Sequence, residues 1–222
     1  PPMFGFFKSL FGQPPHPRSV KPLPPRSARD WLAQQSMRGP ECKWKKLGPL
    51  ALPSGRIFVG DPTGGHDGHM NGAQAVGADA LTAWAFQDRS TGENHIVWLE
   101  ATDALPTHKG AQLDFGVDAA TIGLGDADTG NMFSALTDLE LDAGRGDSFD
   151  WLVPHLQISP NFSSWVKVPP AGLPMLLIST RADGGYAAVW LLDAQGTLCG
   201  ILIDISGRAS DQLFLDKLLP DA

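Results

Sequence analysis

The sequence predicts an α+β fold that is mainly antiparallel β, either β-sandwich-like or two packed sheets, with a few short helices. Gly and Pro together supply 44 of the 222 residues (25 Gly and 19 Pro). Such a share is typical of turn-rich β proteins. Apolar runs of strand length also alternate with turns that contain Gly, Asp or Asn, which is the pattern of successive antiparallel strands.

Strands are expected from the turn at Ser54-Gly55 onward. A short apolar run before Asp61-Pro62 predicts one strand. Two later apolar runs flank a turn at 89–94 that contains Gly and Asn, and this pattern predicts a hairpin. The expected strands there are 57–59, 75–88 and 94–101. Residues 115–130 are expected to form a strand that enters a Gly/Asp-rich turn.

The C-terminal third contains three apolar runs separated by RADGG and AQG. Short Gly-containing turns between such runs predict a three-stranded antiparallel meander. Its strands are expected at 173–180, 186–193 and 197–205.

Helices are expected at four places. A short helix capped by Ser27 or Asp30 should run to about Gln35, with Trp31 and Leu32 facing the body. Apolar residues at roughly helical spacing predict two interior helices and a closing one. These span 131–142, 147–156 and 210–219.

The charge distribution divides the chain into a basic, Pro-rich N-terminal arm (1–46) and a single β-rich domain (47–222). The arm carries nine of the 17 Lys and Arg but two of the 24 acidic residues, a net charge of +7, whereas the domain carries −14. We expect the arm to dock on its own domain or to reach an anionic partner. An acidic domain repels phosphates, so nucleic acid is not the expected partner.

No segment has the roughly 18 consecutive apolar residues of a membrane-spanning helix. The first residues lack a secretory signal, and Cys42 and Cys199 are expected as free thiols rather than a disulfide, so the prediction is a cytoplasmic protein. An apolar cluster near the start would dock on the domain itself, a partner groove or a membrane surface, with self-docking the expected case. It comprises Phe4, Phe6, Phe7, Leu10 and Phe11.

His66, Asp67 and His69 form the sharpest candidate metal site, because two imidazoles and a carboxylate lie within four residues. A zinc site needs further ligands, for which Asp61, Asp79, His95 and His108 are the candidates. A solvated Gly-rich loop explains the same residues, and that interpretation is preferred. We therefore expect no cofactor.

The segment from Asp126 to Asn131 resembles the first half of a calcium loop. Its Gly stands at the fifth position rather than the sixth, and Thr137 stands where a bidentate Glu is expected. An Asp/Gly turn that caps the following helix, through Asp128 or Thr129, is the preferred interpretation.

Motifs for nucleophilic or phosphate chemistry are absent: there is no G-x-S-x-G, no phosphate-binding Gly-rich loop, no H-E-x-x-H and no paired CxxC. Acidic residues instead gather in the second half, and a carboxylate pair of glycosidase type stays open because its separation depends on the fold. The candidate acidic binding surface comprises Asp126, Asp128, Asp138, Glu140, Asp142, Asp147 and Asp150.

Three stretches together resemble the bacterial family described as domain of unknown function 4241. They are LPSGRIFVGDP, FGVDAATIGLGDAD and STRADGGYAAVWLLDAQGTLCGILIDI, and they cover about residues 50 to 206 in order and spacing. The resemblance departs from the family pattern at Phe115, Ala120, Leu192 and Ile205 and implies no established activity. It marks a set of residues that either forms a site or serves the turns: Gly116, Asp118, Asp183, Gly185, Tyr186, Trp190, Asp193 and Asp204.

These observations predict a non-enzymatic binding protein. The acidic domain without a catalytic motif favours a bacterial immunity protein that neutralises a cognate toxin, since complementary charge speeds and orients association. The alternative is a metal-dependent or carboxylate-based hydrolase, for example one built on His66, Asp67, His69 and Asp118.

Overall fold

A computed structural model describes residues 24–36, 41–62, 74–146, 148–156, 160–205 and 219–220. The helices are α1 (Ala28–Gln35), α2 (Ala127–Asp142) and α3 (Ser148–Leu156). The strands are β1 (Cys42–Ala51), β2 (Arg56–Gly60), β3 (Gln74–Ala75), β4 (Ala80–Asp88), β5 (Asn94–Glu100), β6 (His108–Val117), β7 (Thr121–Asp126), β8 (Ser163–Val168), β9 (Leu173–Ser179), β10 (Gly184–Leu192) and β11 (Leu198–Asp204).

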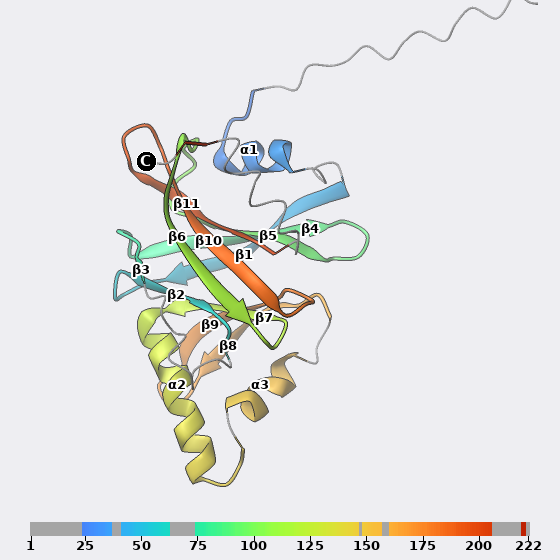
Figure 1. Ribbon diagram of the computed structural model, residues 1–222, viewed down its shortest axis with the longest axis vertical. Coiled ribbons are helices and arrows are strands. Elements are labelled where there is room, and N and C mark those ends of the chain that lie inside the picture. The colour runs from blue at the N-terminus through green and yellow to red at the C-terminus, as the bar shows by residue number, and fades with distance from the viewer. Residues whose placement is uncertain are drawn as a thin grey trace, which may run out of the picture.

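Two sheets form the body, which confirms the predicted α+β fold of packed, mainly antiparallel sheets (Figure 1). One sheet has six strands in the order β1-β4-β5-β11-β10-β6, and the other has five in the order β3-β2-β7-β9-β8. Every strand pair in both sheets is antiparallel. None of the described helices is long and apolar enough to cross a membrane.

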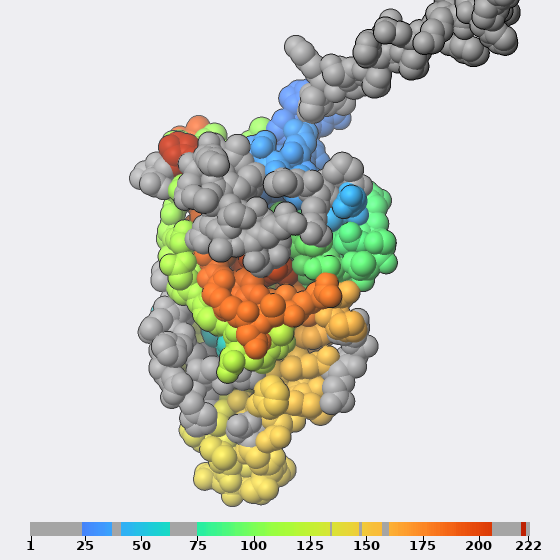
Figure 2. All heavy atoms as spheres, turned by 45° about the vertical axis from the view of Figure 1, so that its right-hand side comes forward, coloured from blue at the N-terminus to red at the C-terminus, as the bar shows by residue number. Residues whose placement is uncertain are grey.

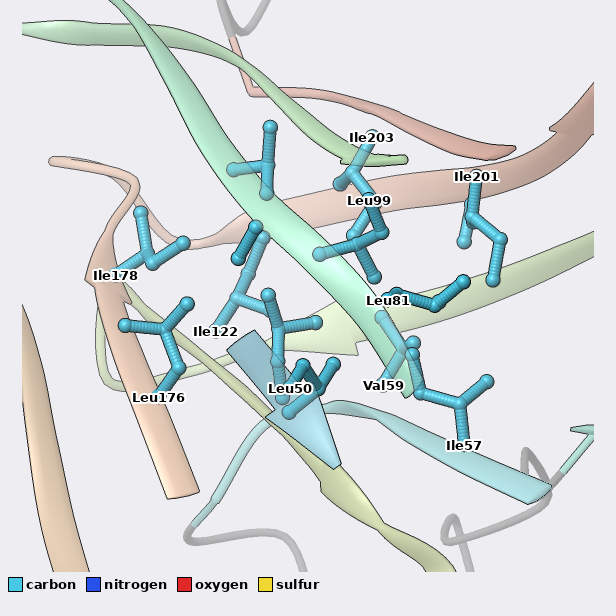
Figure 3. Close-up of a cluster of buried hydrophobic side chains, with 14 of the residues drawn as sticks. Leu50, Ile57, Val59, Leu81, Leu99, Ile122, Leu176, Ile178, Ile201 and Ile203 are labelled. Atoms are coloured by element: carbon cyan, nitrogen blue, oxygen red, sulfur yellow. The ribbon is translucent and has the colours of Figure 1, made fainter. Parts of the chain in front are cut away.

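Three apolar clusters show that the elements stack in four layers. The largest lies between the two sheets and includes Leu99, Ile122 and Leu176 (Figure 3). A second lies between α1 and the outer face of the six-stranded sheet, and a third lies between the five-stranded sheet and the helices α2 and α3. Each sheet is therefore covered on both faces.

The alternation of side chains along a strand explains how two covered faces are built. In β5, Val97 and Leu99 point into the space between the sheets, whereas Trp98 packs toward α1. In β9, Leu176 points between the sheets and Leu177 packs toward α2 and α3. A strand with apolar residues on both faces needs cover on both sides, so these runs read as continuously apolar in the sequence.

The predicted C-terminal meander is wrong in its first strand. β10 and β11 form the expected hairpin, but β9 pairs with β7 and β8 in the other sheet. The short turn after Ser179 carries the chain from one sheet to the other instead of folding it back. A short turn shows that two strands follow each other closely, and it leaves open which of two stacked sheets the second strand joins.

The segment 115–130 also differs from its prediction. It forms the end of β6, a corner at 118–120, the strand β7 and the start of α2, so the chain changes sheet here as well. The expected hairpin around 89–94 is confirmed as β4–β5, and the two interior helices are confirmed as α2 and α3. The prediction has no strand for β1, for β8 or for most of β6.

Helix α1 is part of the packed body. Ser27 caps it by accepting a hydrogen bond from the Asp30 amide, as predicted, and Leu32 is fully buried against the six-stranded sheet. The Arg29 guanidinium donates to Glu100 at 2.8 Å and lies 3.9 Å from the centre of the Trp84 ring.

The expected boundary between residues 46 and 47 falls inside β1, which pairs with β4 from Cys42 onward. The closing helix expected at 210–219 lies outside the described residues except for Leu219.

A buried amide at the start of β5 joins the two sheets. Asn94 donates to the main-chain oxygens of Phe162 and Ser179 at 3.2 and 3.3 Å. Its own oxygen accepts from the Gln87 amide at 2.7 Å. All three partners belong to buried residues, so water does not readily replace the bonds that this one side chain makes.

We predict that Asn94→Ala lowers the free energy of unfolding by about 2–3 kcal/mol, because it leaves buried donors and acceptors without partners. Gln112→Ala, which removes an exposed amide, should change it by less than about 0.5 kcal/mol. Urea unfolding of the two variants measures the difference. Equal effects would show that the buried amide is not the link between the sheets.

Candidate functional site

The predicted acidic surface divides into one buried residue and a group of exposed ones. Asp126 is only 4% exposed. Its Oδ1 accepts from the Asp128 amide at 2.9 Å and caps α2, while its Oδ2 accepts from the Ser54 amide and hydroxyl at 2.9 and 2.8 Å. Asp126 therefore does not belong to a binding surface, a correction to the prediction. It is also the helix cap, in place of the expected Asp128 or Thr129.

The helix cap explains the resemblance of this segment to a calcium loop. Both oxygens of Asp126 are occupied by protein donors, and Asp128 to Asn131 already form the first turn of α2. Oxygen-bearing residues at alternate positions also serve a helix N-terminus, where the first amides need acceptors. The preferred interpretation of a capping turn is confirmed.

The other described members of the acidic group lie on α2 and α3. Asp128, Asp138, Asp142 and Asp150 are exposed, and Glu140 is half-buried. Asp147 lies outside the described residues. The α2–α3 end, yellow in Figure 2, projects from the rest of the body. The structure thus gathers Asp138, Glu140, Asp142 and Asp150 around the end of α2 and the start of α3, whereas Asp128 lies in the first turn of α2, at the other end of that helix.

The position of these carboxylates opposes the stability of α2. The last turn of α2 contains no basic residue, and carboxylates near a helix C-terminus interact unfavourably with the partial negative charge there. Asp138 and Asp142 are also four residues apart, a spacing at which like charges on a helix repel each other. Glu140 pairs with Arg145 at 2.8 Å, and the hydrogen bond from Arg145 lowers the Glu140 pKa.

Large apolar side chains lie exposed among these carboxylates. Leu139, Leu141 and Phe149 are 48%, 52% and 44% exposed, although they occupy the end of α2 and the beginning of α3. Leu141 lies three residues from Asp138 and therefore on the same side of α2. We call this region, from Asp138 to Asp150, the acidic tip. Apolar anchors ringed by charge are typical of surfaces that bind proteins.

The residues marked by the family resemblance gather mainly at a second place, where β6 and β10 pair. Gly116 lies opposite Gly185, and Phe115 lies opposite Tyr186. These four residues, with Gln112 and Asp114, line an open hollow of about 610 Å³. The rings of Phe115 and Tyr186 stack with centres 6.1 Å apart.

Hydrogen bonds explain several of these residues as parts of turns. Asp183 accepts from the Ala120 amide at 2.9 Å, and the Tyr186 hydroxyl donates to the Ala182 oxygen at 2.8 Å. Asp193 accepts from the amides of Gln195 and Thr197, both at 2.9 Å, in the β10–β11 turn. These residues therefore stabilise the turns through their hydrogen bonds, and none of these contacts forms a catalytic arrangement.

Three marked residues have other positions. Trp190 is buried between the sheets, and its indole nitrogen has no hydrogen-bond partner among the described residues. Asp118 is exposed at the corner after β6, and Asp204 is half-buried at the end of β11. The residue set is thus spread over a hollow, two turns and the core.

One cluster of potential metal ligands was missed by the sequence analysis. Single ligand atoms of Cys42, Asp88 and His95 lie within 4.8 Å of one another. The three residues belong to β1, β4 and β5, so no local motif reveals them, although His95 is a candidate distant ligand of the predicted His66–His69 site. His66, Asp67 and His69 lie outside the described residues, and their metal site stays a prediction.

The two cysteines are both present as thiols. Cys199 is buried beneath α1 in the second apolar cluster. Burial, followed by the negative charge of Asp193, raises the pKa of the Cys199 thiol to about 11. Because the thiolate is the reactive form, Cys199 has the environment of a structural rather than a nucleophilic cysteine.

Comparison of the chain with protein-family models, with curated proteins and with solved structures finds no match. The resemblance to domain of unknown function 4241 stays a prediction.

We predict that Cys199 makes the stability of the domain fall between about pH 9 and pH 11. In this window the unfolded chain loses the thiol proton whereas the folded chain keeps it, so unfolding is favoured as the pH rises. Cys199→Ala should remove this part of the pH dependence. Thermal unfolding of both proteins from pH 8 to pH 11 measures it, and parallel curves would contradict the raised pKa.

We also predict that Gly116→Ala and Gly185→Ala leave the fold intact, because an added Cβ meets no atom within 4 Å at either position. Gly200→Ala should be strongly destabilising, since its Cβ would clash with the Leu99 oxygen and the Trp98 ring. Melting temperatures of the three variants test this contrast. A severe effect of the first two would mean that the hollow is filled in solution.

Proposed function

We propose that this chain is a non-enzymatic binding protein, an immunity protein of the bacterial cytoplasm that neutralises a cognate toxin through the acidic tip. The observation that carries the proposal is the placement of Asp138 and Asp142, two exposed carboxylates close to the C-terminus of α2. They weaken their own helix through the helix dipole and through mutual repulsion. A basic partner removes both penalties when it binds.

The chemistry around these carboxylates fits a protein partner. The segment 127–156 contains six acidic residues and one Arg, so its potential attracts a basic surface from a distance. Leu139, Leu141 and Phe149 supply the apolar contacts that hold a complex once it has formed. A toxin that cleaves nucleic acid has a basic active-site cleft, and such a cleft is the expected docking surface.

The acidic tip is less suited to catalysis. Asp138 and Asp142 are exposed on a helix surface, whereas general acid catalysis by a carboxyl group depends on a water-poor environment that raises its pKa. The binding function therefore uses the observed properties of the tip, namely exposure, charge and apolar side chains, without requiring any further group.

We predict that Asp138→Asn/Asp142→Asn weakens partner binding while it raises the stability of the domain slightly, by about 0.3–1 kcal/mol. The matched control is Asp79→Asn/Asp103→Asn, which removes the same charge from two exposed residues away from the tip. Each full-length protein is used as bait in an extract of the native organism at low and high salt, and its captured proteins are identified by mass spectrometry.

The expected result is a basic protein that is captured by wild type and by the control, that is lost in the double variant, and that dissociates at high salt. The product of the adjacent gene is the first candidate. Unfolding curves establish that the double variant is folded. A partner that binds the double variant as well as it binds wild type would contradict the proposal, as would capture that depends equally on both carboxylate pairs.

A further inference from the structure

Three strands of the six-stranded sheet meet where β1 begins, β4 ends and β5 begins. Cys42 is the first residue of β1 and lies directly opposite Asp88, the last residue of β4. Side chains of residues directly opposite in an antiparallel ladder point to the same face and lie close together. The thiol and the carboxylate are therefore neighbours because of the strand register.

A β-bulge brings His95 to this pair. Phe86 pairs with Ile96, but Gln87 pairs with Asn94, so His95 is the extra residue in β5. A bulge changes the direction of a side chain relative to a regular ladder and recurs next to functional sites. The result is that one ligand atom each of Cys42, Asp88 and His95 lies within 4.8 Å of the others.

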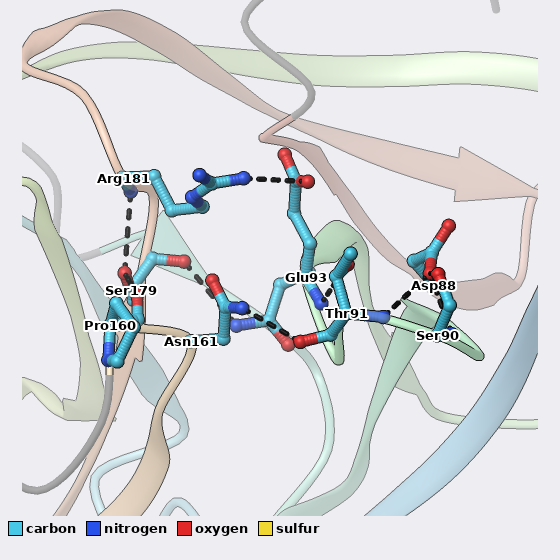
Figure 4. Close-up of polar contacts among 9 residues, drawn as sticks. Asp88, Ser90, Thr91, Glu93, Pro160, Asn161, Ser179 and Arg181 are labelled. Carbon is cyan, nitrogen blue, oxygen red and sulfur yellow. Dashed lines mark hydrogen bonds and ion pairs between the residues drawn. The ribbon is translucent and has the colours of Figure 1, made fainter.

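In the hairpin turn, one carboxylate oxygen of Asp88 accepts all of its hydrogen bonds from the turn, and the other oxygen accepts none of them. Oδ1 accepts from the Ser90 hydroxyl at 2.6 Å, from the Ser90 amide at 2.7 Å and from the Thr91 amide at 2.8 Å. Three donors of the turn thus converge on Oδ1 and fix the orientation of the Asp88 carboxylate. Figure 4 shows its second oxygen pointing away from Ser90 and Thr91.

The same turn is anchored to the neighbouring sheet, which makes the position of Asp88 rigid. Asn161 donates to the Thr91 oxygen at 2.8 Å, and Arg181 pairs with Glu93 at 2.6 Å (Figure 4). The beginning of β1 is tied to this hairpin as well, because Arg89 donates to the Cys42 oxygen at 3.0 Å. A site held by such supporting contacts is preorganised for a ligand.

The arrangement fits metal coordination better than nucleophilic catalysis. In a Cys-His-Asp relay, the thiol and the carboxylate bind opposite edges of the imidazole and lie well apart, whereas here all three atoms are mutually close. A catalytic thiol must also be reached by substrate, and Cys42 is only 2% exposed. His95 is 4% exposed. An ion would therefore enter the site from the side of Asp88, which is half-exposed.

We propose that Cys42, Asp88 and His95 bind one Zn²⁺ ion, with a water molecule as the fourth ligand. Sulfur, nitrogen and oxygen are the ligand atoms that zinc takes in proteins, and tetrahedral zinc with its usual bond lengths puts them about 3.3–3.8 Å apart. Each separation therefore shortens by at most about 1.5 Å when the site closes around the ion. The bound ion would link the start of β1 to the β4–β5 hairpin.

Zinc binding by the full-length, tag-free, reduced protein tests the proposal, with Zn²⁺ measured against a competing chelator and Co²⁺ used as a spectroscopic probe. Asp88→Asn is the central variant, because its Oδ1 still accepts the bonds of the turn while the charged second oxygen is lost. Cys42→Ser removes the thiolate. Cys199→Ala is the control for the other thiol, and His66→Ala/His69→Ala is the control for the predicted loop site.

We expect one Zn²⁺ per chain, an affinity at least about 10-fold lower in Asp88→Asn, and a melting temperature that zinc raises in wild type but not in this variant. The thiolate-to-cobalt charge-transfer band should disappear in Cys42→Ser and persist in both controls. Absence of stoichiometric binding overturns the proposal. So does binding that survives Asp88→Asn and Cys42→Ser, or that is lost only in His66→Ala/His69→Ala.

Discussion

The chain passes between its two sheets four times, and hydrogen bonds tie these crossings together in two pairs. The crossing after β1 contacts the one after β3, since the Leu52 amide donates to the Asp79 oxygen at 2.7 Å and the Val76 amide donates to the Gly55 oxygen at 2.9 Å. The crossing after β6 contacts the one after β9 through Ala120, which accepts from the Thr180 amide and donates to Asp183. Each pair fixes the offset of one sheet over the other.

That offset determines which side chains meet in the core. Leu176 and Ile178 of one sheet share a buried cluster with Leu99 and Ile203 of the other because the sheets are held in one relative position (Figure 3). The paired crossings also use the residues that the family resemblance marked, among them Asp183 and Tyr186. Their role as turn residues accounts for a pattern that resembled a site.

The acidic tip and the Cys42–Asp88–His95 cluster belong to different layers and rest on different physics. The tip depends on long-range charge and on exposed apolar contacts at the end of α2, so its expected partner is a macromolecule. The cluster depends on short distances fixed by strand register and a bulge, so its expected ligand is a small ion. The proposed partner binding at α2 and α3 and the proposed ion binding at β1, β4 and β5 therefore use separate elements, so that neither disturbs the other.

Sequence patterns predicted the features that depend on neighbours along the chain. The cap at Ser27, the hairpin at 89–94 and the helices near 131–142 and 147–156 follow from side chains within a few residues of one another. The acidic character of the tip was likewise visible as composition. The predicted meander at 173–205 is wrong because β9 and β10 are joined by a short turn yet lie in different sheets. The residues of a turn do not determine which sheet the next strand joins.

The sequence by itself therefore determined the class of fold, most local turns and the charge of the surface that is proposed to bind a partner. Only the tertiary structure decided which sheet each strand joins, that Asp126 is a buried cap rather than a surface acid, and that residues 42, 88 and 95 meet. The physical reason is that strand pairing and bulges act between segments far apart in the chain. Their outcome depends on the packing of both sheets together, whereas caps and hairpin turns are settled by adjacent residues.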